Sequence, residues 1–285
     1  MSKPPFLTLP PVARARRLGT ARGEFAVHEA GAPVRGSALL VPGFTGSKED
    51  FIALLEPLAA AGYRVTAVDG RGQYESPGPR EEAPYALEEL ARDLLAQAAA
   101  LGGGPVHLVG HSLGGLVSRA AVLRDPSPFA SLTLMSSGPA AIDEGQRART
   151  KLLVAALEAL REDMPAVWAA MRAQDAPDVV PDSPEVAHFL RERWLATVPE
   201  QLIVTGRALI SEPDRVDALA AVALPKMVLS GTVDYAWPVP LMDDMARRLG
   251  AERVVVPAAE HSPNAENPQV TAGALAAFWD SVDAR

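Results

Sequence analysis

The pentapeptide Gly-His-Ser-Leu-Gly at residues 110–114 lies between two segments of different pattern. Residues 106–109 are typical of a buried strand, and residues 113–123 have helical periodicity, so Ser112 is expected on a sharp strand-to-helix turn. The glycines permit this turn and let the helix pack close to the strand. The Ser112 hydroxyl then lies at the amino end of a helix, where the backbone N–H of Leu113 can bind a developing oxyanion. This motif, a nucleophile elbow, predicts that Ser112 is a nucleophile.

A serine hydroxyl attacks a carbonyl carbon only when a base accepts its proton, and an acidic group orients that base. Five histidines could be the base, at positions 28, 107, 111, 188 and 261, and the chain has no cysteine. The predicted chemistry therefore requires one of these histidines and a carboxylate to meet Ser112 in the folded chain.

The composition limits the possible partners of this site. The chain has 285 residues, 48% of them hydrophobic, which favours one large domain with an insertion. Its net charge of −8 and its lack of a long basic tract disfavour nucleic acid and favour a small-molecule partner. We expect no metal and no cofactor. No apolar run has the length of a signal peptide or a bilayer span, so we expect a cytoplasmic protein without membrane insertion. The oligomeric state stays open.

Apolar strand patterns alternate with helical patterns along most of the chain. The strand patterns lie at residues 37–41, 63–68, 106–109, 131–136, 226–230 and 253–256, after an antiparallel hairpin at residues 17–20 and 24–28. Such alternation predicts an α/β fold, with a doubly wound, mostly parallel sheet and right-handed crossovers.

The alternation stops between residues 142 and 210. Three helical stripes occur there: Leu152, Leu153, Ala156, Leu157 and Leu160; Met164, Val167, Trp168 and Met171; and Val186, Phe189, Leu190 and Trp194. Aspartates and prolines at residues 175–184 predict a loop within this block. We predict that residues 142–210 form a helical cap over the carboxyl edge of the sheet. The cap would be inserted into a core made of residues 15–141 and 211–285.

This order of elements, together with the elbow, resembles the α/β-hydrolase superfamily over residues 17–282. The resemblance implies an α/β-hydrolase fold with an eight-stranded, mostly parallel sheet and helices on both faces. It also implies a catalytic triad on loops at the carboxyl edge and a helical cap after the sixth strand.

The resemblance also implies which side chains complete the triad. The family holds its base between the last strand and the last helix, where this chain has His261. It holds the acid after the seventh strand, where this chain has Asp234, which would accept the imidazole N–H and stabilise the imidazolium. Asp143 and Glu144 follow the sixth strand, where some members place the acid, and they remain alternatives.

The second donor of the oxyanion hole is expected in the loop after the third strand, at residues 42–46. The backbone N–H of Phe44 is the candidate, paired with that of Leu113. Pro42 replaces a histidine that is common in relatives. The hole should survive this change because both donors belong to the main chain.

Residues 69–76 resemble the family's Asp-x-Arg-Gly-x-Gly-x-Ser loop, with Tyr74 at a position where glycine is usual. Asp69 and Arg71 are expected to brace this loop. The predicted substrate contacts are Phe44, His111, Tyr74, Trp168 and Trp237, with Trp237 at the pocket rim. The alternative for the tryptophans of the predicted cap is packing against the sheet.

The sequence thus predicts a serine hydrolase that cleaves a small-molecule ester or a related acyl compound through an acyl-enzyme intermediate. A lactonase, a thioesterase, a cofactor-free perhydrolase or a lyase could use the same triad. A dehalogenase or an epoxide hydrolase is disfavoured because each normally has aspartate at the elbow. A ligand-binding sensor that retains the triad is the alternative from another class.

Overall fold

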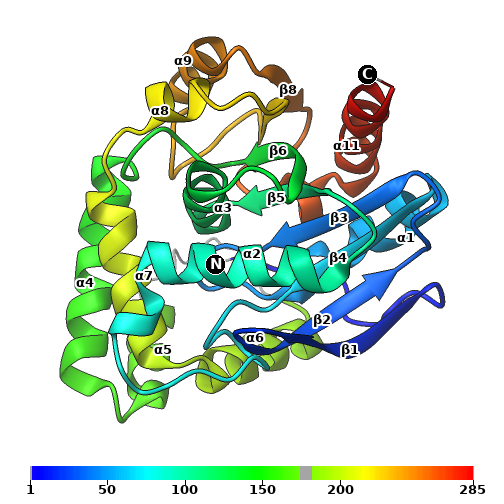
Figure 1. Ribbon diagram of the computed structural model, residues 1–285. Helices are drawn as coiled ribbons and strands as arrows, with labels where there is room; N and C mark the ends of the chain where they lie inside the picture. Colours follow the sequence, from blue (N-terminus) through cyan, green and yellow to red (C-terminus); the bar gives the residue numbers. More distant parts are fainter. Residues whose placement is uncertain (1, 174–181, 285) are drawn as a thin grey trace.

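The computed structural model describes residues 2–173 and 182–284. In these residues eight strands form one sheet in the order β1-β2-β4-β3-β5-β6-β7-β8 (Figure 1). β2 is antiparallel to β1 and to β4, and the other neighbours are parallel. The strands are β1 (Ala13–Thr20), β2 (Gly23–Ala30), β3 (Gly36–Val41), β4 (Tyr63–Val68), β5 (Val106–His111), β6 (Phe129–Met135), β7 (Lys226–Gly231) and β8 (Glu252–Val256).

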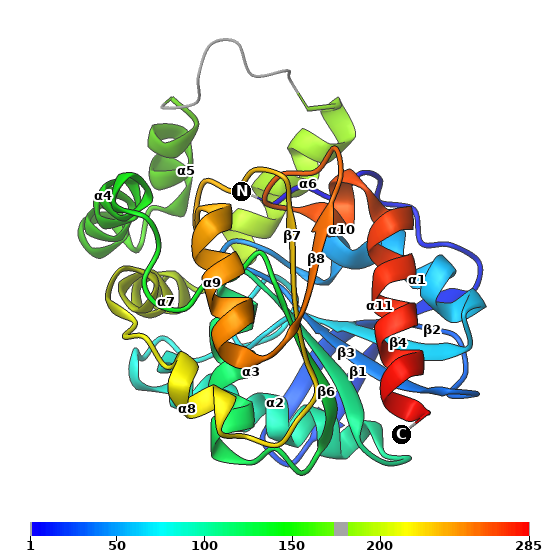
Figure 2. The same cartoon turned by 90° about the horizontal axis from the view of Figure 1, so that it is seen from above.

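Helices cover both faces of the sheet (Figure 2). One face packs against α1 (Ile52–Ala60) and α11 (Pro268–Asp283). The other packs against α2 (Leu87–Leu101), α3 (Leu113–Arg124), α8 (Val216–Ala220) and α9 (Val239–Leu249). Short helical turns are η1 (Lys48–Phe51), η2 (Ala83–Tyr85) and α10 (Pro263–Glu266). None of the described helices combines the length and the apolar composition needed to cross a lipid bilayer.

The middle strands are apolar on both faces because helices cover both. Leu39 of β3 and Leu108 of β5 pack toward α2 and α3, and their neighbours Leu40 and Val109 pack toward α1 and α11. All four side chains are fully buried. This two-sided burial explains the continuous apolar runs and confirms the predicted α/β class.

Four helices lie between β6 and β7 in the sequence, and we call them the helical insertion. They are α4 (Glu144–Leu160), α5 (Met164–Arg172), α6 (Pro184–Ala196) and α7 (Pro199–Ser211). In Figure 1, α4, α5 and α7 lie on the side to which the arrows of β3 and β5 point. A small apolar cluster of their own, which includes Leu157, Val167, Trp194 and Leu202, holds these helices together.

The predicted apolar stripe of α4 is wrong at two positions. Leu152 and Leu160 are 63% and 43% exposed, whereas Val154 and Leu157 are buried. The loop predicted at residues 175–184 lies mostly outside the described residues, and Pro184 already begins α6. The short α10, which follows His261, was not predicted.

A buried arginine fastens the helical insertion to the core. Arg193 of α6 is 1% exposed and donates to Asp50 Oδ1 at 2.8 Å and to Ser47 Oγ at 3.3 Å. Its second terminal nitrogen donates to the carbonyl oxygen of Ser2 at 2.7 Å, so it also holds the N-terminal segment. Asp50 is fully buried, and its charge depends on this partner.

We expect Arg193→Leu to lower the free energy of unfolding by about 3–5 kcal/mol, because it leaves the buried Asp50 carboxylate without its ion pair. Urea denaturation followed by circular dichroism measures the loss. Arg191→Leu, on an exposed position of the same helix, is the control and should stay within about 0.5 kcal/mol of wild type. Adding Asp50→Asn to Arg193→Leu should recover part of the loss. Equal midpoints for the two leucine variants would contradict the assignment.

Candidate active site

Ser112 lies on a tight turn between β5 and α3. Its backbone has φ 55° and ψ −120°, a conformation that is rare for a residue with a side chain. The flanking glycines are required because a side chain at either position would clash with the backbone. A Cβ on Gly110 would lie 2.3 Å from the carbonyl oxygen of Gly114, and a Cβ on Gly114 would lie 2.4 Å from the carbonyl oxygen of Val41. The turn is therefore held in this shape by close backbone packing.

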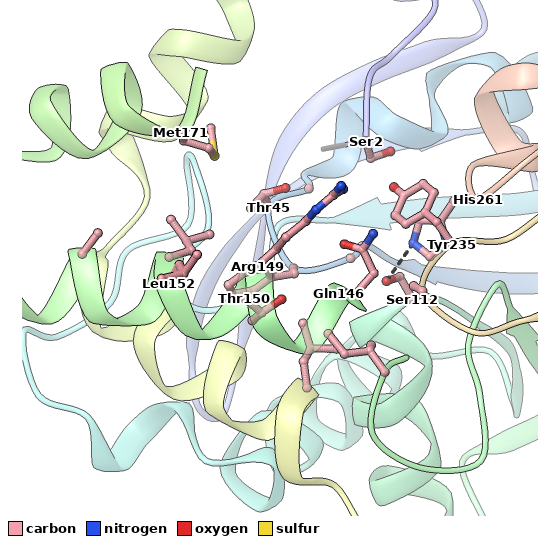
Figure 3. Close-up of a pocket in the computed structure, with 18 of the residues that line it drawn as sticks. Ser2, Thr45, Ser112, Gln146, Arg149, Thr150, Leu152, Met171, Tyr235 and His261 are labelled. Carbon is pink, nitrogen blue, oxygen red and sulfur yellow. Dashed lines mark hydrogen bonds between the residues drawn. The ribbon is translucent and has the colours of Figure 1, made fainter. Parts of the chain in front are cut away.

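Ser112, His261 and Asp234 form a continuous hydrogen-bonded chain, part of which Figure 3 shows. His261 Nδ1 is 2.8 Å from Asp234 Oδ2, and His261 Nε2 is 3.1 Å from Ser112 Oγ. A carboxylate can only accept, so Nδ1 carries the hydrogen and the lone pair of Nε2 faces the serine hydroxyl. The serine then donates to Nε2, as a base that removes its proton requires.

The structure also distinguishes between the candidate acids. Asp234 Oδ1 accepts hydrogen bonds from the backbone N–H groups of Ala236 and Trp237, at 2.8 and 3.0 Å, and its side chain is fully buried. Asp143 instead caps α4, where its Oδ1 accepts from the N–H of Gly145 at 2.9 Å, and it is exposed. Of these carboxylates, the geometry brings Asp234 to the histidine.

Two backbone N–H groups are available beside Ser112. Leu113 is the first residue of α3, and Gly43 lies so close that a Cβ there would be 3.2 Å from Ser112 Cβ. Within the described residues, neither the N–H of Leu113 nor that of Phe44 has a hydrogen-bond acceptor. The two predicted donors therefore remain free to bind an oxyanion.

Gln73, which sequence reasoning missed, supports the loop that contains Phe44. Its Nε2 donates to the carbonyl oxygen of Gly43 at 2.9 Å, and its Oε1 accepts from the N–H of Gly70 at 2.9 Å. The side chain thus links the loop after β3 to the loop after β4, on a chain that has Pro42 in place of a histidine. The only signal in the sequence was the position of Gln73 within residues 69–76, the loop in which Asp69 and Arg71 were predicted to be the bracing residues.

Asp69 and Arg71 brace this loop, in agreement with the prediction. Asp69 is fully buried and accepts from the backbone N–H of Lys48 at 2.7 Å and from Lys48 Nζ at 3.0 Å. Arg71 forms a bidentate ion pair with Asp93 of α2, at 2.7 and 2.6 Å.

A cavity of about 320 Å³ opens at Ser112 and His261 and extends between α4 and α5. Phe44 and His111, two of the predicted substrate contacts, line it. Tyr74, Trp168 and Trp237 are not among its described lining residues, so the structure does not place these three predicted contacts at the cavity. In residues 2–173 and 182–284, no group of three or more histidine, aspartate or glutamate side chains is arranged to hold a metal ion.

Each of these three aromatic side chains contacts another part of the protein instead of the cavity. Trp237 is 1% exposed and donates to the carbonyl oxygen of Ala140 at 2.9 Å, because the turn capped by Asp234 directs it inward. Tyr74, at φ 41°, packs edge-on against Phe189 of α6. Trp168 packs against Trp194 inside the helical insertion.

His111 supports His261 through a hydrogen bond to its backbone. Its Nε2 donates to the carbonyl oxygen of His261 at 2.8 Å, and the side chain is 1% exposed. Burial, with the nearby His261 adding to it, lowers the pKa of His111 from 6.5 to about 3, so the imidazole is neutral at physiological pH. His111 thereby fixes the backbone of the loop that contains His261 without adding a charge to the site.

Comparison with known proteins places the chain among hydrolases. A family model described as the alpha/beta hydrolase fold matches residues 39–268. A pimeloyl-[acyl-carrier protein] methyl ester esterase from Aeromonas hydrophila is 31% identical over 221 residues, which cover 75% of this chain and 84% of that protein. The solved structure of a thermophilic esterase from Thermogutta terrifontis, with malate bound, has a TM-score of 0.76 at 26% identity and covers 95% of this chain and 99% of its own. A hydrolase structure from Pseudomonas aeruginosa has a TM-score of 0.76 at 27% identity, with 93% and 98% covered.

The chain belongs to the α/β hydrolase fold family. The predicted family, the eight-stranded fold and the prediction of a hydrolase are thereby confirmed.

The neutral, buried His111 predicts a loss of stability in acid. Its folded pKa lies below its unfolded value of 6.5, so its contribution is complete above pH 6.5 and is lost as the pH falls toward about 3. At about 1.4 kcal/mol per pH unit, it would account for a loss of about 2 kcal/mol between pH 6.5 and pH 5. His111→Gln keeps a donor for the His261 carbonyl but does not titrate, so its unfolding free energy should fall less over that range.

Urea unfolding at pH 6.5 and pH 5 measures this difference. His28, whose pKa burial lowers to about 4, contributes equally in both proteins and cancels. His188→Gln, on an exposed position of α6, should keep the wild-type pH dependence. The assignment is refuted if His111→Gln keeps it too.

Proposed function

We propose that this hydrolase is a serine esterase that acts on a carboxylic ester of small size through an acyl-enzyme intermediate. The observation that carries the proposal is the hydrogen-bonded chain from Asp234 through His261 to Ser112, at one end of a cavity. The esterase activity named for the relatives from Aeromonas hydrophila and Thermogutta terrifontis supports the same class of bond.

In the first half of the reaction, Ser112 Oγ attacks the carbonyl carbon of the ester while His261 Nε2 takes its proton. Asp234 stabilises the imidazolium through its bond to Nδ1. The carbonyl oxygen becomes an oxyanion, which the N–H groups of Phe44 and Leu113 bind. When the carbon–oxygen bond to the alcohol breaks, the imidazolium returns its proton to the leaving oxygen, and the acyl group stays on Ser112.

In the second half, a water molecule attacks the acyl-enzyme and gives one proton to His261 Nε2. The second tetrahedral intermediate collapses, Ser112 regains that proton, and the carboxylic acid leaves. One ester and one water give one acid and one alcohol, so the enzyme returns to its starting state without a cofactor.

The helical insertion would act as the substrate-selecting cap of this enzyme. Its helices α4 and α5 supply much of the cavity wall, including Gln146, Leu153 and Met171. Residues 142–210 would then choose the substrate, while residues 15–141 and 211–285 supply the reacting groups. A small acyl compound is the partner that such a cavity fits.

Ser112→Ala should lower kcat/KM for p-nitrophenyl acetate and butanoate by a thousandfold or more, on the order expected when a nucleophile is removed. A fluorophosphonate probe should phosphonylate Ser112 and no other serine, which mass spectrometry of tryptic peptides resolves. Ser127→Ala, an exposed serine after α3, is the matched control and should keep wild-type turnover. Full turnover by Ser112→Ala would refute the mechanism, and absent labelling together with tight ligand binding would favour a sensor.

Asp234→Asn should lower kcat on the order of a thousandfold, because the amide can donate to Nδ1 and so favour the tautomer whose Nε2 carries the hydrogen. Asp143→Asn removes the alternative acid but only alters the cap of α4, so kcat should stay within a factor of about two. Steady-state kinetics of both variants on one ester decide between the two carboxylates. A large loss in Asp143→Asn with little loss in Asp234→Asn would reverse the assignment.

A further inference from the structure

One face of α4 lines the cavity with polar groups near Ser112 and apolar groups farther away. Gln146, Arg149 and Thr150 are spaced i, i+3 and i+4, so they share a helix face, and Leu153 and Ala156 continue it. All five line the cavity. In Figure 3, Gln146 lies beside Ser112, and the guanidinium of Arg149 reaches into the cavity between Thr45 and Gln146.

Arg149 is the permanently charged residue of this wall. Among the described residues that line the cavity, no other lysine, arginine, aspartate or glutamate occurs. Within the described part of the chain, Arg149 also has no ion-pair partner. This is so even though the whole chain has 35 acidic and 27 basic residues. The neighbouring Arg147 is turned away and donates to the carbonyl oxygen of Ile142 at 2.8 Å. A guanidinium in this position offers a fork of donors that matches a carboxylate.

The position of this charge along the cavity indicates where an anion would lie. The reacting hydroxyl and imidazole are at one end, and Met171 of α5 and Leu152 of α4 lie toward the other. Arg149 lies between these two ends (Figure 3). An ester seated at Ser112 would therefore meet the cation a short distance along its chain, before it reaches the apolar end.

We propose that the preferred substrates are esters that carry a carboxylate on a short chain, which Arg149 binds while Ser112 attacks the ester carbonyl. This inference rests on the proposed esterase function and adds its substrate class. Gln146 and Thr150, on the same helix face, supply neutral hydrogen-bonding groups on either side of the bound carboxylate. A guanidinium without a carboxylate partner gives the anion its charge complement, which a neutral ester of the same length lacks.

The test compares monomethyl with dimethyl esters of succinate, glutarate and adipate, with proton release measured in a pH-stat. The wild-type enzyme should favour the monomethyl ester at one of these chain lengths. In Arg149→Gln the ratio of kcat/KM for the monomethyl over the dimethyl ester should fall about tenfold to a hundredfold, mainly through KM, as expected for loss of a charge-assisted hydrogen bond. Arg149→Lys should recover part of it. Lys151→Gln, on an exposed position of the same helix that does not line the cavity, should keep the wild-type ratio.

Direct binding separates this inference from the proposed reaction. Ser112→Ala should bind the free dicarboxylate of the preferred length in isothermal titration calorimetry, and Ser112→Ala/Arg149→Gln should bind it at least tenfold more weakly. If dimethyl esters are hydrolysed but neither the ester ratio nor dicarboxylate binding depends on Arg149, the substrate class is wrong and the esterase function stands. If no ester is hydrolysed but dicarboxylate binding depends on Arg149, the anion site stands and the esterase function fails.

Discussion

The hydrogen bond between His261 and Asp234 joins the loops that follow β7 and β8, and the geometry of the site depends on it. The two loops pack directly: the N–H of Thr232 donates to the carbonyl oxygen of Ala259 at 2.8 Å, and a Cβ on Gly231 would lie 2.2 Å from that same oxygen. Because β7 and β8 are parallel neighbours, their carboxyl ends deliver both side chains to one edge of the sheet. Ser112, at the end of β5, reaches the same edge across β6.

Three other side chains, two neutral and one charged, hold the segments that surround the triad in place. His111 holds the backbone of His261, Gln73 holds the loop of Gly43, and Arg193 ties the helical insertion to Asp50. Each is buried and hydrogen-bonded to the core, so the site is supported by side chains that are not themselves members of the triad. Burial keeps His111 uncharged, which prevents repulsion when His261 becomes an imidazolium.

The sequence predicted best where local pattern and topology agree. The apolar runs of β3 and β5 and the elbow at Ser112 follow from periodicity. The roles of Asp234 and His261 follow from the resemblance to the α/β-hydrolase superfamily, and the structure brings these three side chains together. Trp237 could not be placed this way, because the turn that directs it inward depends on hydrogen bonds to Asp234. Arg149 could not be predicted for another reason. The cavity-lining face of α4 begins with polar residues, whereas the prediction for α4 rested on its apolar positions, part of which are exposed.

The N-terminal segment lies beside the cavity of the candidate active site. Ser2 lines the cavity, and its carbonyl oxygen is bound by Arg193, whereas α11 ends away from it (Figure 2). A peptide fused ahead of Ser2 would therefore begin beside the cavity. An affinity handle or a surface linkage is better attached after α11, which ends away from the cavity.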